Sequence, residues 1–203
     1  MVPAVVLEVV ESTTHAPQEI PMESALMSDP TLTIQGSVVR LIRGDITELE
    51  VDAFVFYATE DLALGSGFGG MISVRGGPSV QKELNELAPV APLGVVASGA
   101  GKLPAEHILH AVGPRFREDD IETKLLTTME NTLRVAEEKG IETLAFPAMG
   151  AGYYGIPADV SARVMLDALQ GHLAGDTRLK EVIICVLDTP QFKAFESALA
   201  ACG

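Results

Sequence analysis

Two glycine-rich segments are the parts of this chain best suited to holding an anion. The first, residues 64–72, reads LGSGFGGMI, and the second, residues 146–157, reads FPAMGAGYYGIP. Glycines let the backbone approach a ligand closely, and the N-terminus of a helix just behind such a loop adds positive potential. Glycine-rich loops also serve tight packing, so each segment alone is a weak signal for a phosphate site.

Charged residues are almost absent from both segments. Between Leu62 and Val80 the only charged residue is Arg75, and between Ala145 and Ala158 there is none, although the chain has 28 Asp and Glu residues. A phosphate site in an acidic protein requires this exclusion, but two buried loops would also show it. The pattern therefore supports an anion site without proving one.

A third candidate is Asp45, in the segment Arg43-Gly44-Asp45-Ile46-Thr47. A carboxylate here can accept a hydrogen bond from an exocyclic amine such as that of adenine. Asp-x-Thr is also common at turns and helix caps, and the residues alone favour that structural role.

Tyr153 and Tyr154, two of the chain's three tyrosines, lie in the second glycine-rich segment. An aromatic side chain among glycines has little to pack on except a ligand or an opposing loop. The alternative is that one tyrosine belongs to the core and the other lies on the surface.

The histidines do not form a second candidate site. His107 and His110 should face opposite sides of a strand, and no catalytic triad or metal-binding spacing is present, so we predict no metal and no cofactor.

Alternating strands and helices must position these segments. A parallel sheet covered on both faces follows from such alternation, and ligands bind such sheets beyond the carboxyl ends of the strands. Both glycine-rich segments directly follow expected strands. We expect strands at residues 31–34, 37–42, 51–57, 95–97, 107–112, 143–146 and 181–187, and helices at 81–87, at 121–139, after Pro157, and from 189 to about 200.

The composition limits the class of protein. The net charge of −14 disfavours binding to bulk nucleic acid and to anionic membranes, and no apolar run reaches the ~20 residues of a membrane span. Cys185 and Cys202 suggest no disulfide framework. A signal peptide requires basic residues near its start, and no Lys or Arg precedes Arg40. We therefore expect a cytoplasmic protein.

Residues 1–30 are expected to form an N-terminal arm, and residues 31–203 an α/β domain. The arm has four prolines and no helical period. Residues 5–10 could form a strand that adds to a sheet edge of the same chain or of a partner, which would make a homo-oligomer through the arm.

Five motifs in order resemble those of the macrodomain family. The resemblance extends from about Thr31 to the C-terminus, and it implies a three-layer α/β/α fold with a central mixed, mostly parallel sheet and ADP-ribose bound above it. The motifs are Gly44-Asp45-Ile46-Thr47, Val51-Asp52-Ala53-Phe54-Val55, Gly76-Gly77-Pro78, His110-Ala111-Val112-Gly113-Pro114 and the segment 146–157.

The resemblance also implies roles for individual residues. Asp45 would receive the adenine amine and Ile46 would pack in the adenine pocket. Tyr154 would flank the distal ribose. The remaining ligand-binding candidates are Thr59, Gly65, Gly67, Phe68 and Gly69 on one side, and Gly150, Ala151, Gly152 and Tyr153, which would cradle the phosphates, on the other.

Departures from the family pattern concern hydrolysis. Phe56-Tyr57-Ala58-Thr59 stands where the family has Asn-Ala-Ala-Asn, so Thr59 replaces the asparagine that holds the distal ribose in hydrolytic members. Gly69 replaces an acid. Hydrolysis needs an oriented water and a group that activates it, which neither residue supplies. Glu60 and Asp61 are expected to face solvent, and we predict no catalytic residue.

Three functions stay open on the sequence alone. The favoured one is binding of ADP-ribose, a related adenine nucleotide or an ADP-ribosylated protein without hydrolysis. The second is an atypical ADP-ribosyl hydrolase or deacetylase. The third is a structural or oligomerisation role with a degenerate cleft, because Leu64 and Ser66 also replace glycines and Phe56 and Tyr57 add bulk.

Overall fold

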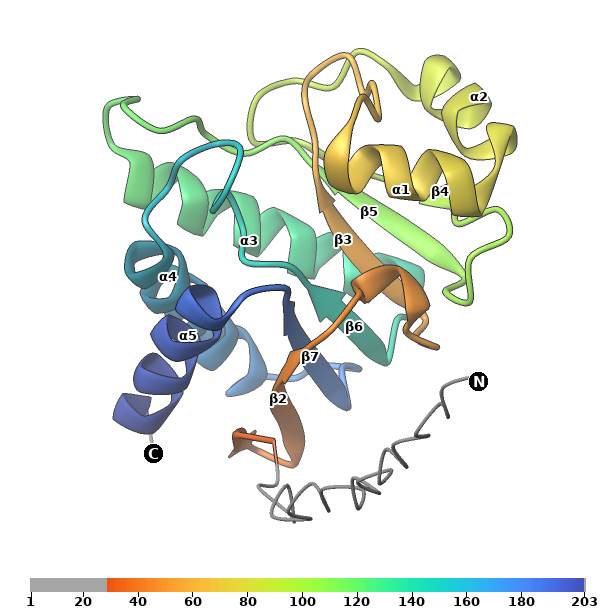
Figure 1. Ribbon diagram of the computed structural model, residues 1–203. Helices are drawn as coiled ribbons and strands as arrows, with labels where there is room; N and C mark the ends of the chain where they lie inside the picture. The colour runs from red at the N-terminus through yellow and green to blue at the C-terminus, as the bar shows by residue number, and fades with distance from the viewer. Residues whose placement is uncertain (1–28, 203) are drawn as a thin grey trace, which may run out of the picture.

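The computed structural model describes residues 29–202, which form a seven-stranded sheet with helices on both faces (Figure 1). The expected strand at residues 5–10 lies outside the described residues. In chain order the elements are β1 (Thr31–Ile34), β2 (Ser37–Arg43), the 3-10 helix η1 (Ile46–Glu48), β3 (Ala53–Tyr57), α1 (Gly67–Gly76), α2 (Pro78–Leu87), β4 (Val95–Gly99), β5 (His107–Ala111), α3 (Ile121–Lys139), β6 (Thr143–Phe146), α4 (Ala158–Leu173), β7 (Glu181–Val186) and α5 (Thr189–Cys202).

The sheet has the order β1-β2-β7-β6-β3-β5-β4. The four inner pairings, from β2 through β7, β6 and β3 to β5, are parallel, and the outer strands β1 and β4 pair antiparallel with their neighbours. This confirms the mixed, mostly parallel sheet. The carboxyl ends of the five inner strands therefore share one edge, which we call the carboxyl edge.

Residues of the inner strands alternate between two cores. In β3, Val55 and Tyr57 pack on the side of α3, α4 and α5, whereas Phe54 and Phe56 pack on the side of α1 and α2. All five residues of β3 are buried, as a continuous apolar run in a sheet covered on both faces predicts. The result is the expected three-layer α/β/α arrangement (Figure 1).

The helices differ from expectation at the first glycine-rich segment. There α1 already begins at Gly67, and α2 begins at Pro78, earlier than the expected residue 81. Pro78 suits a first helical turn because its missing N–H is not needed there. Packing of Phe68 in the first turn of α1 against Phe54 and Phe56 outweighs the poor helix propensity of the glycines.

Among residues 29–202, no helix is long and apolar enough to cross a membrane. The same part of the chain holds no cluster of three or more His, Cys, Asp or Glu side chains arranged to bind a metal ion.

Candidate functional site

The second glycine-rich segment forms a loop of residues 147–157 at the carboxyl end of β6, which we call the second loop. Three of its own hydrogen bonds close it, from Ala151 N to Ala148 O (3.1 Å), from Gly155 N to Gly152 O (3.0 Å) and from Ile156 N to Gly150 O (3.0 Å). Within residues 150–154, the backbone N–H groups that donate to no acceptor among the described residues are those of Gly150, Gly152, Tyr153 and Tyr154. Unused N–H groups in an uncharged loop form a ready anion site.

Glycine is needed in the second loop for two different reasons. Gly150 and Gly152 both have positive φ, of 71° and 81°. A Cβ at Gly150 would lie 2.4 Å from Ile156 Cδ1, whereas a Cβ at Gly152 would meet no atom within 4 Å. Gly150 is therefore fixed by packing inside the loop, and Gly152 leaves its outer surface open to a ligand.

The two adjacent tyrosines have different surroundings. Tyr154 is half-buried, and its ring lies 4.7 Å from that of Tyr57, whose hydroxyl donates to Pro114 O. Tyr153 is 95% exposed and touches the Tyr154 ring edge-on. This matches the alternative in which one tyrosine packs inward and the other lies on the surface, and Tyr153 offers the site its backbone N–H more readily than its ring.

Residues 58–66 link β3 to α1 and are called the first loop; the first glycine-rich segment, residues 64–72, spans the end of this loop and the first turns of α1. Gly65 and Gly67 have positive φ, and a Cβ at either would meet open space. Ser66, the N-cap of α1, makes no side-chain capping bond. The first N–H groups of a helix lack intrahelical partners, so the N-terminus of α1 is free to bind an anion.

Phe68 and Gly69 are held by packing within the protein. The Phe68 ring lies 5.3 Å from the Phe56 ring, and a Cβ at Gly69 would lie 1.7 Å from Leu64 O. Any ligand contact of these two residues must therefore use backbone atoms or the outer edge of the phenyl ring. Phe56 and Tyr57, expected to narrow the cleft, are buried in the cores.

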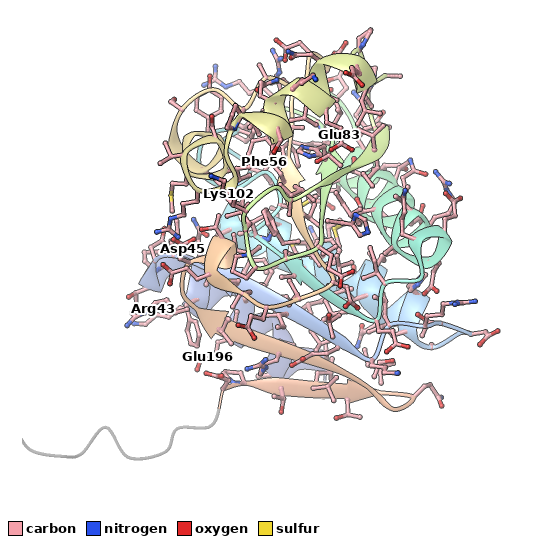
Figure 2. The ribbon with its side chains drawn as sticks, turned by 90° about the vertical axis from the view of Figure 1, so that its right-hand side faces the viewer. Arg43, Asp45, Phe56, Glu83, Lys102 and Glu196 are labelled. Carbon is pink, nitrogen blue, oxygen red and sulfur yellow. The ribbon has the colours of Figure 1, made fainter. Side chains whose placement is uncertain are left out.

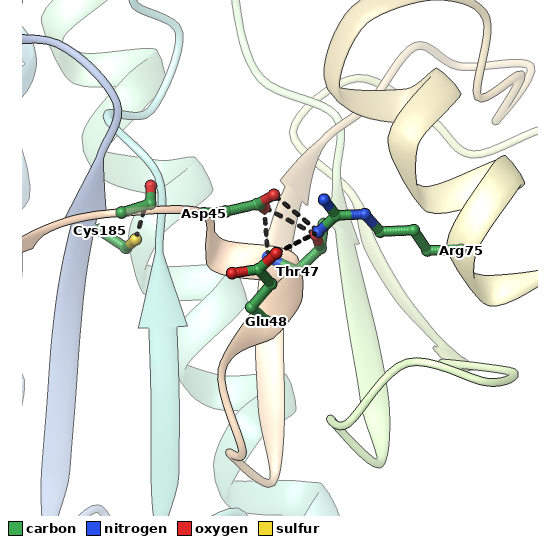
Figure 3. Close-up of polar contacts among 6 residues, drawn as sticks. Asp45, Thr47, Glu48, Arg75 and Cys185 are labelled. Carbon is green, nitrogen blue, oxygen red and sulfur yellow. Dashed lines mark hydrogen bonds and ion pairs between the residues drawn. The ribbon is translucent and has the colours of Figure 1, made fainter.

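Asp45 follows β2 and serves as the N-cap of η1. Its Oδ1 accepts hydrogen bonds from Thr47 N (3.0 Å) and Thr47 Oγ1 (2.7 Å), and its Oδ2 accepts one from Arg75 Nη1 (2.7 Å; Figure 3). Burial alone would raise the pKa of Asp45, but the bonds from Thr47 and the Arg75 guanidinium outweigh it and lower that pKa. Asp45 is therefore a charged acceptor, while its neighbour Ile46 is buried in the core.

Thr59 lies two residues after the end of β3, beside a cavity of about 320 Å³. Its hydroxyl donates to Asp61 Oδ1 (2.5 Å), and Asp61 and Glu60 are exposed, as predicted. Tyr154 and Arg115 also line this cavity. Sequence reasoning missed Arg115 because it stands just beyond the His110–Pro114 motif, in a segment without glycine or periodicity.

His110 and Cys185 are reactive residues that the fold buries. His110 is fully buried, its Nε2 lies 2.8 Å from Ser98 Oγ, and burial lowers its pKa to about 3, so the ring is neutral. Burial also raises the pKa of the Cys185 thiol to about 11. Burial and these pKa shifts argue against either residue as the nucleophile or base of a second site.

Comparisons with known proteins point to one family. The family model described as Macro domain matches residues 57–165. An uncharacterized protein of Saccharolobus solfataricus is 38% identical over 167 residues, which is 80% of this chain and 92% of that protein.

Solved structures share the fold. The Oceanobacillus iheyensis macrodomain with ADP superposes with a TM-score of 0.80 at 22% identity, covering 85% of this chain and 95% of that one. The Trypanosoma brucei macrodomain in complex with ADP-ribose gives a TM-score of 0.74 at 24% identity, covering 79% of this chain and 68% of that one.

Proposed function

Because this chain belongs to the macrodomain family, we propose that it binds ADP-ribose or a related adenine nucleotide along its carboxyl edge, without hydrolysing it. The observation that carries the proposal is the set of four unused backbone N–H groups in the second loop. They can hold a diphosphate without any basic side chain, which suits a protein of net charge −14.

The strand order supports the same ligand. Asp45 follows β2, the second loop follows β6 and the first loop follows β3, and β7 lies between β2 and β6. Three strand spacings of about 4.8 Å separate β2 from β3, roughly 14 Å along the edge. An extended ligand can thus meet Asp45 with its base, the second loop with its phosphates and the N-terminus of α1 with its far end. The solved macrodomains of Oceanobacillus iheyensis and Trypanosoma brucei described above are complexes with ADP and with ADP-ribose.

The residues around the far end of the site argue against hydrolysis. The Thr59 hydroxyl is committed to Asp61, and the packing of Gly69 against Leu64 leaves no space for an acidic side chain at that position. Glu60 and Asp61 are exposed to solvent. Glu60 also lines the cavity beside Thr59, but its exposure to solvent makes it a poor candidate to orient and activate a water.

Titration calorimetry with ADP-ribose, ADP and AMP tests the proposal. We expect micromolar binding that favours ADP-ribose, and Asp45→Ala should weaken it about 10- to 100-fold because a charge-assisted hydrogen bond is lost. No heat with any of the three nucleotides would refute the proposal. Release of ADP-ribose from a modified protein would instead support the hydrolase alternative.

Gly152→Glu tests the second loop directly, with Gly36→Glu as its matched control. Both glycines have positive φ and open space at the Cβ position, but Gly36 lies in the β1–β2 turn, away from the carboxyl edge. The backbone strain is therefore similar in both variants. Only Gly152→Glu should abolish binding, because it places a carboxylate against the phosphates. Equal loss in both variants would contradict a phosphate site in this loop.

A further inference from the structure

Arg75 reaches from the last turn of α1 to the segment that holds Asp45. Its Nη1 lies 2.7 Å from Asp45 Oδ2, 2.7 Å from Thr47 Oγ1 and 3.1 Å from Glu48 Oε1 (Figure 3). One guanidinium nitrogen carries only two hydrogens, so Nη1 meets more acceptors than it can serve. Arg75 therefore closes the base end of the proposed site from the side of α1.

The other nitrogens of the Arg75 guanidinium are free to donate hydrogen bonds to a ligand. Neither Nε nor Nη2 of Arg75 donates to any acceptor within residues 29–202, which leaves three N–H groups, and the side chain is 41% exposed. Asp45 Oδ2 accepts from Arg75 alone, and a carboxylate oxygen can accept a second bond. A free acceptor and free donors thus lie side by side at a solvent-accessible position.

Arg75 also compensates the negative charge at this end of the site. Asp45 and Glu48 bring two negative charges to this end of the site, and Arg75 is the cation that pairs with both. It is also the only charged residue between Leu62 and Val80. Without it, an anionic nucleotide would approach two uncompensated carboxylates.

We propose that Arg75 is a specificity-determining residue of the nucleotide site, which donates a hydrogen bond to the adenine ring nitrogen beside the amino group that Asp45 accepts. This inference rests on the proposed function. Adenine presents its amino donor next to a ring-nitrogen acceptor, which is the complement of a carboxylate next to a guanidinium. The order is fixed, because Thr47 holds Asp45 and α1 holds Arg75.

The test combines ligand analogues that lack one ring nitrogen with a variant that lacks the Arg75 charge. We would titrate wild type, Arg75→Gln and Arg43→Gln with ADP-ribose and with its 1-deaza and 7-deaza analogues, each of which lacks one ring nitrogen. Arg43 is the matched control, since it lies near Asp45 at the end of β2 (Figure 2). Its guanidinium donates to Thr189 Oγ1 and not to Asp45. Thermal unfolding would confirm that both variants are folded.

We expect wild type and Arg43→Gln to bind one of the two analogues about tenfold more weakly than ADP-ribose, the loss of one hydrogen bond to a charged donor. Arg75→Gln should bind ADP-ribose about tenfold more weakly and should no longer distinguish that analogue. An unchanged analogue ratio in Arg75→Gln, or tighter binding by it, would overturn the role of Arg75 and leave the proposed function standing. Absence of ADP-ribose binding by wild type would overturn both.

Discussion

Glu137 is a single carboxylate on which three segments of the chain converge. Near the end of α3, it accepts hydrogen bonds from His172 Nε2 in the last turn of α4 (3.0 Å), from Thr177 Oγ1 and from Arg178 N (3.1 Å). Burial by itself would raise the pKa of Glu137, but the bonds from Thr177, His172 and Arg178 outweigh it and lower that pKa. The carboxylate therefore ties α3 and α4 to the segment that leads into β7.

Glu137→Gln should lower the free energy of unfolding by about 1–2 kcal/mol at neutral pH, because a partly buried set of charge-assisted bonds is weakened. A lowered pKa in the folded state means that the stabilisation is complete above the unfolded-state pKa of about 4.5 and is lost as the pH falls below it. Urea denaturation at pH 7 and near pH 3 measures both effects.

Glu138→Gln is the control for this prediction. Glu138 is exposed and pairs with Arg134 one turn earlier in the same helix. Such pairs contribute little, so the variant should stay within about 0.5 kcal/mol of wild type. A difference between Glu137→Gln and wild type that persists unchanged at pH 3 would contradict the ionic role of Glu137.

At the scale of elements, α1 depends on a close approach to the loop in front of it. A Cβ at Gly69 would lie 1.7 Å from Leu64 O and 3.0 Å from the Phe56 ring, whereas a Cβ at Gly70 would lie 3.5 Å from Gly65 O. The first contact is impossible without moving the backbone, and the second is ordinary. Two neighbouring glycines of one helix therefore have opposite tolerance for a side chain.

Gly69→Ala should destabilise the protein by about 2–3 kcal/mol, because the first loop must shift to make room. Gly70→Ala should be neutral or slightly stabilising, since alanine favours a helix over glycine by up to about 1 kcal/mol. Thermal unfolding of the two variants makes the comparison. Equal melting temperatures would mean that the loop adjusts freely and does not position α1.

Most of the elements could be predicted from local patterns. Apolar runs such as the one ending at Tyr57 specify strands on their own, and the spacing of Leu125, Met129 and Leu133 specifies α3. The start of α1 at Gly67 could not be predicted, because glycine has poor helix propensity and the compensating contact of Phe68 with Phe56 is tertiary. The family match and the fold class are confirmed.

The candidate site could be predicted in outline but not in its contacts. Motif order identified Asp45 and both loops, since these follow strands in a parallel sheet. The ion pair between Asp45 and Arg75 joins residues 30 apart in the chain. It depends on the direction of α1, which no local pattern encodes. Likewise, only packing decides that Tyr154 turns toward Tyr57 and Tyr153 outward. Which residues touch a ligand stays a prediction.

For the whole molecule, the net charge of −14 and the proposed site of backbone N–H groups should have opposite effects on an anionic ligand. The general field repels the ligand and is screened by salt, whereas short hydrogen bonds to the second loop are screened little. Salt should therefore not weaken binding in the way it weakens binding to basic sites.

Raising NaCl from about 20 mM to about 300 mM should leave the affinity for ADP-ribose unchanged or raise it about two- to threefold. Titrations at the two ionic strengths measure this, with uncharged adenosine as a control that should not respond. A tenfold loss of ADP-ribose affinity at the higher salt would show that side-chain cations such as Arg75 dominate, and that the second loop does not carry the phosphates.

The position of β7 between β2 and β6 has a consequence for the order in which this protein can fold. Ser37 at the start of β2 bonds to Leu179 O, 142 residues later in the chain, and β2 meets no other inner strand. Such distant pairings form slowly. Until residues 181–186 are available, Asp45 and the second loop have no fixed spacing. A fragment cut before Glu181 would keep every motif of the proposed site in its sequence and yet lack the site.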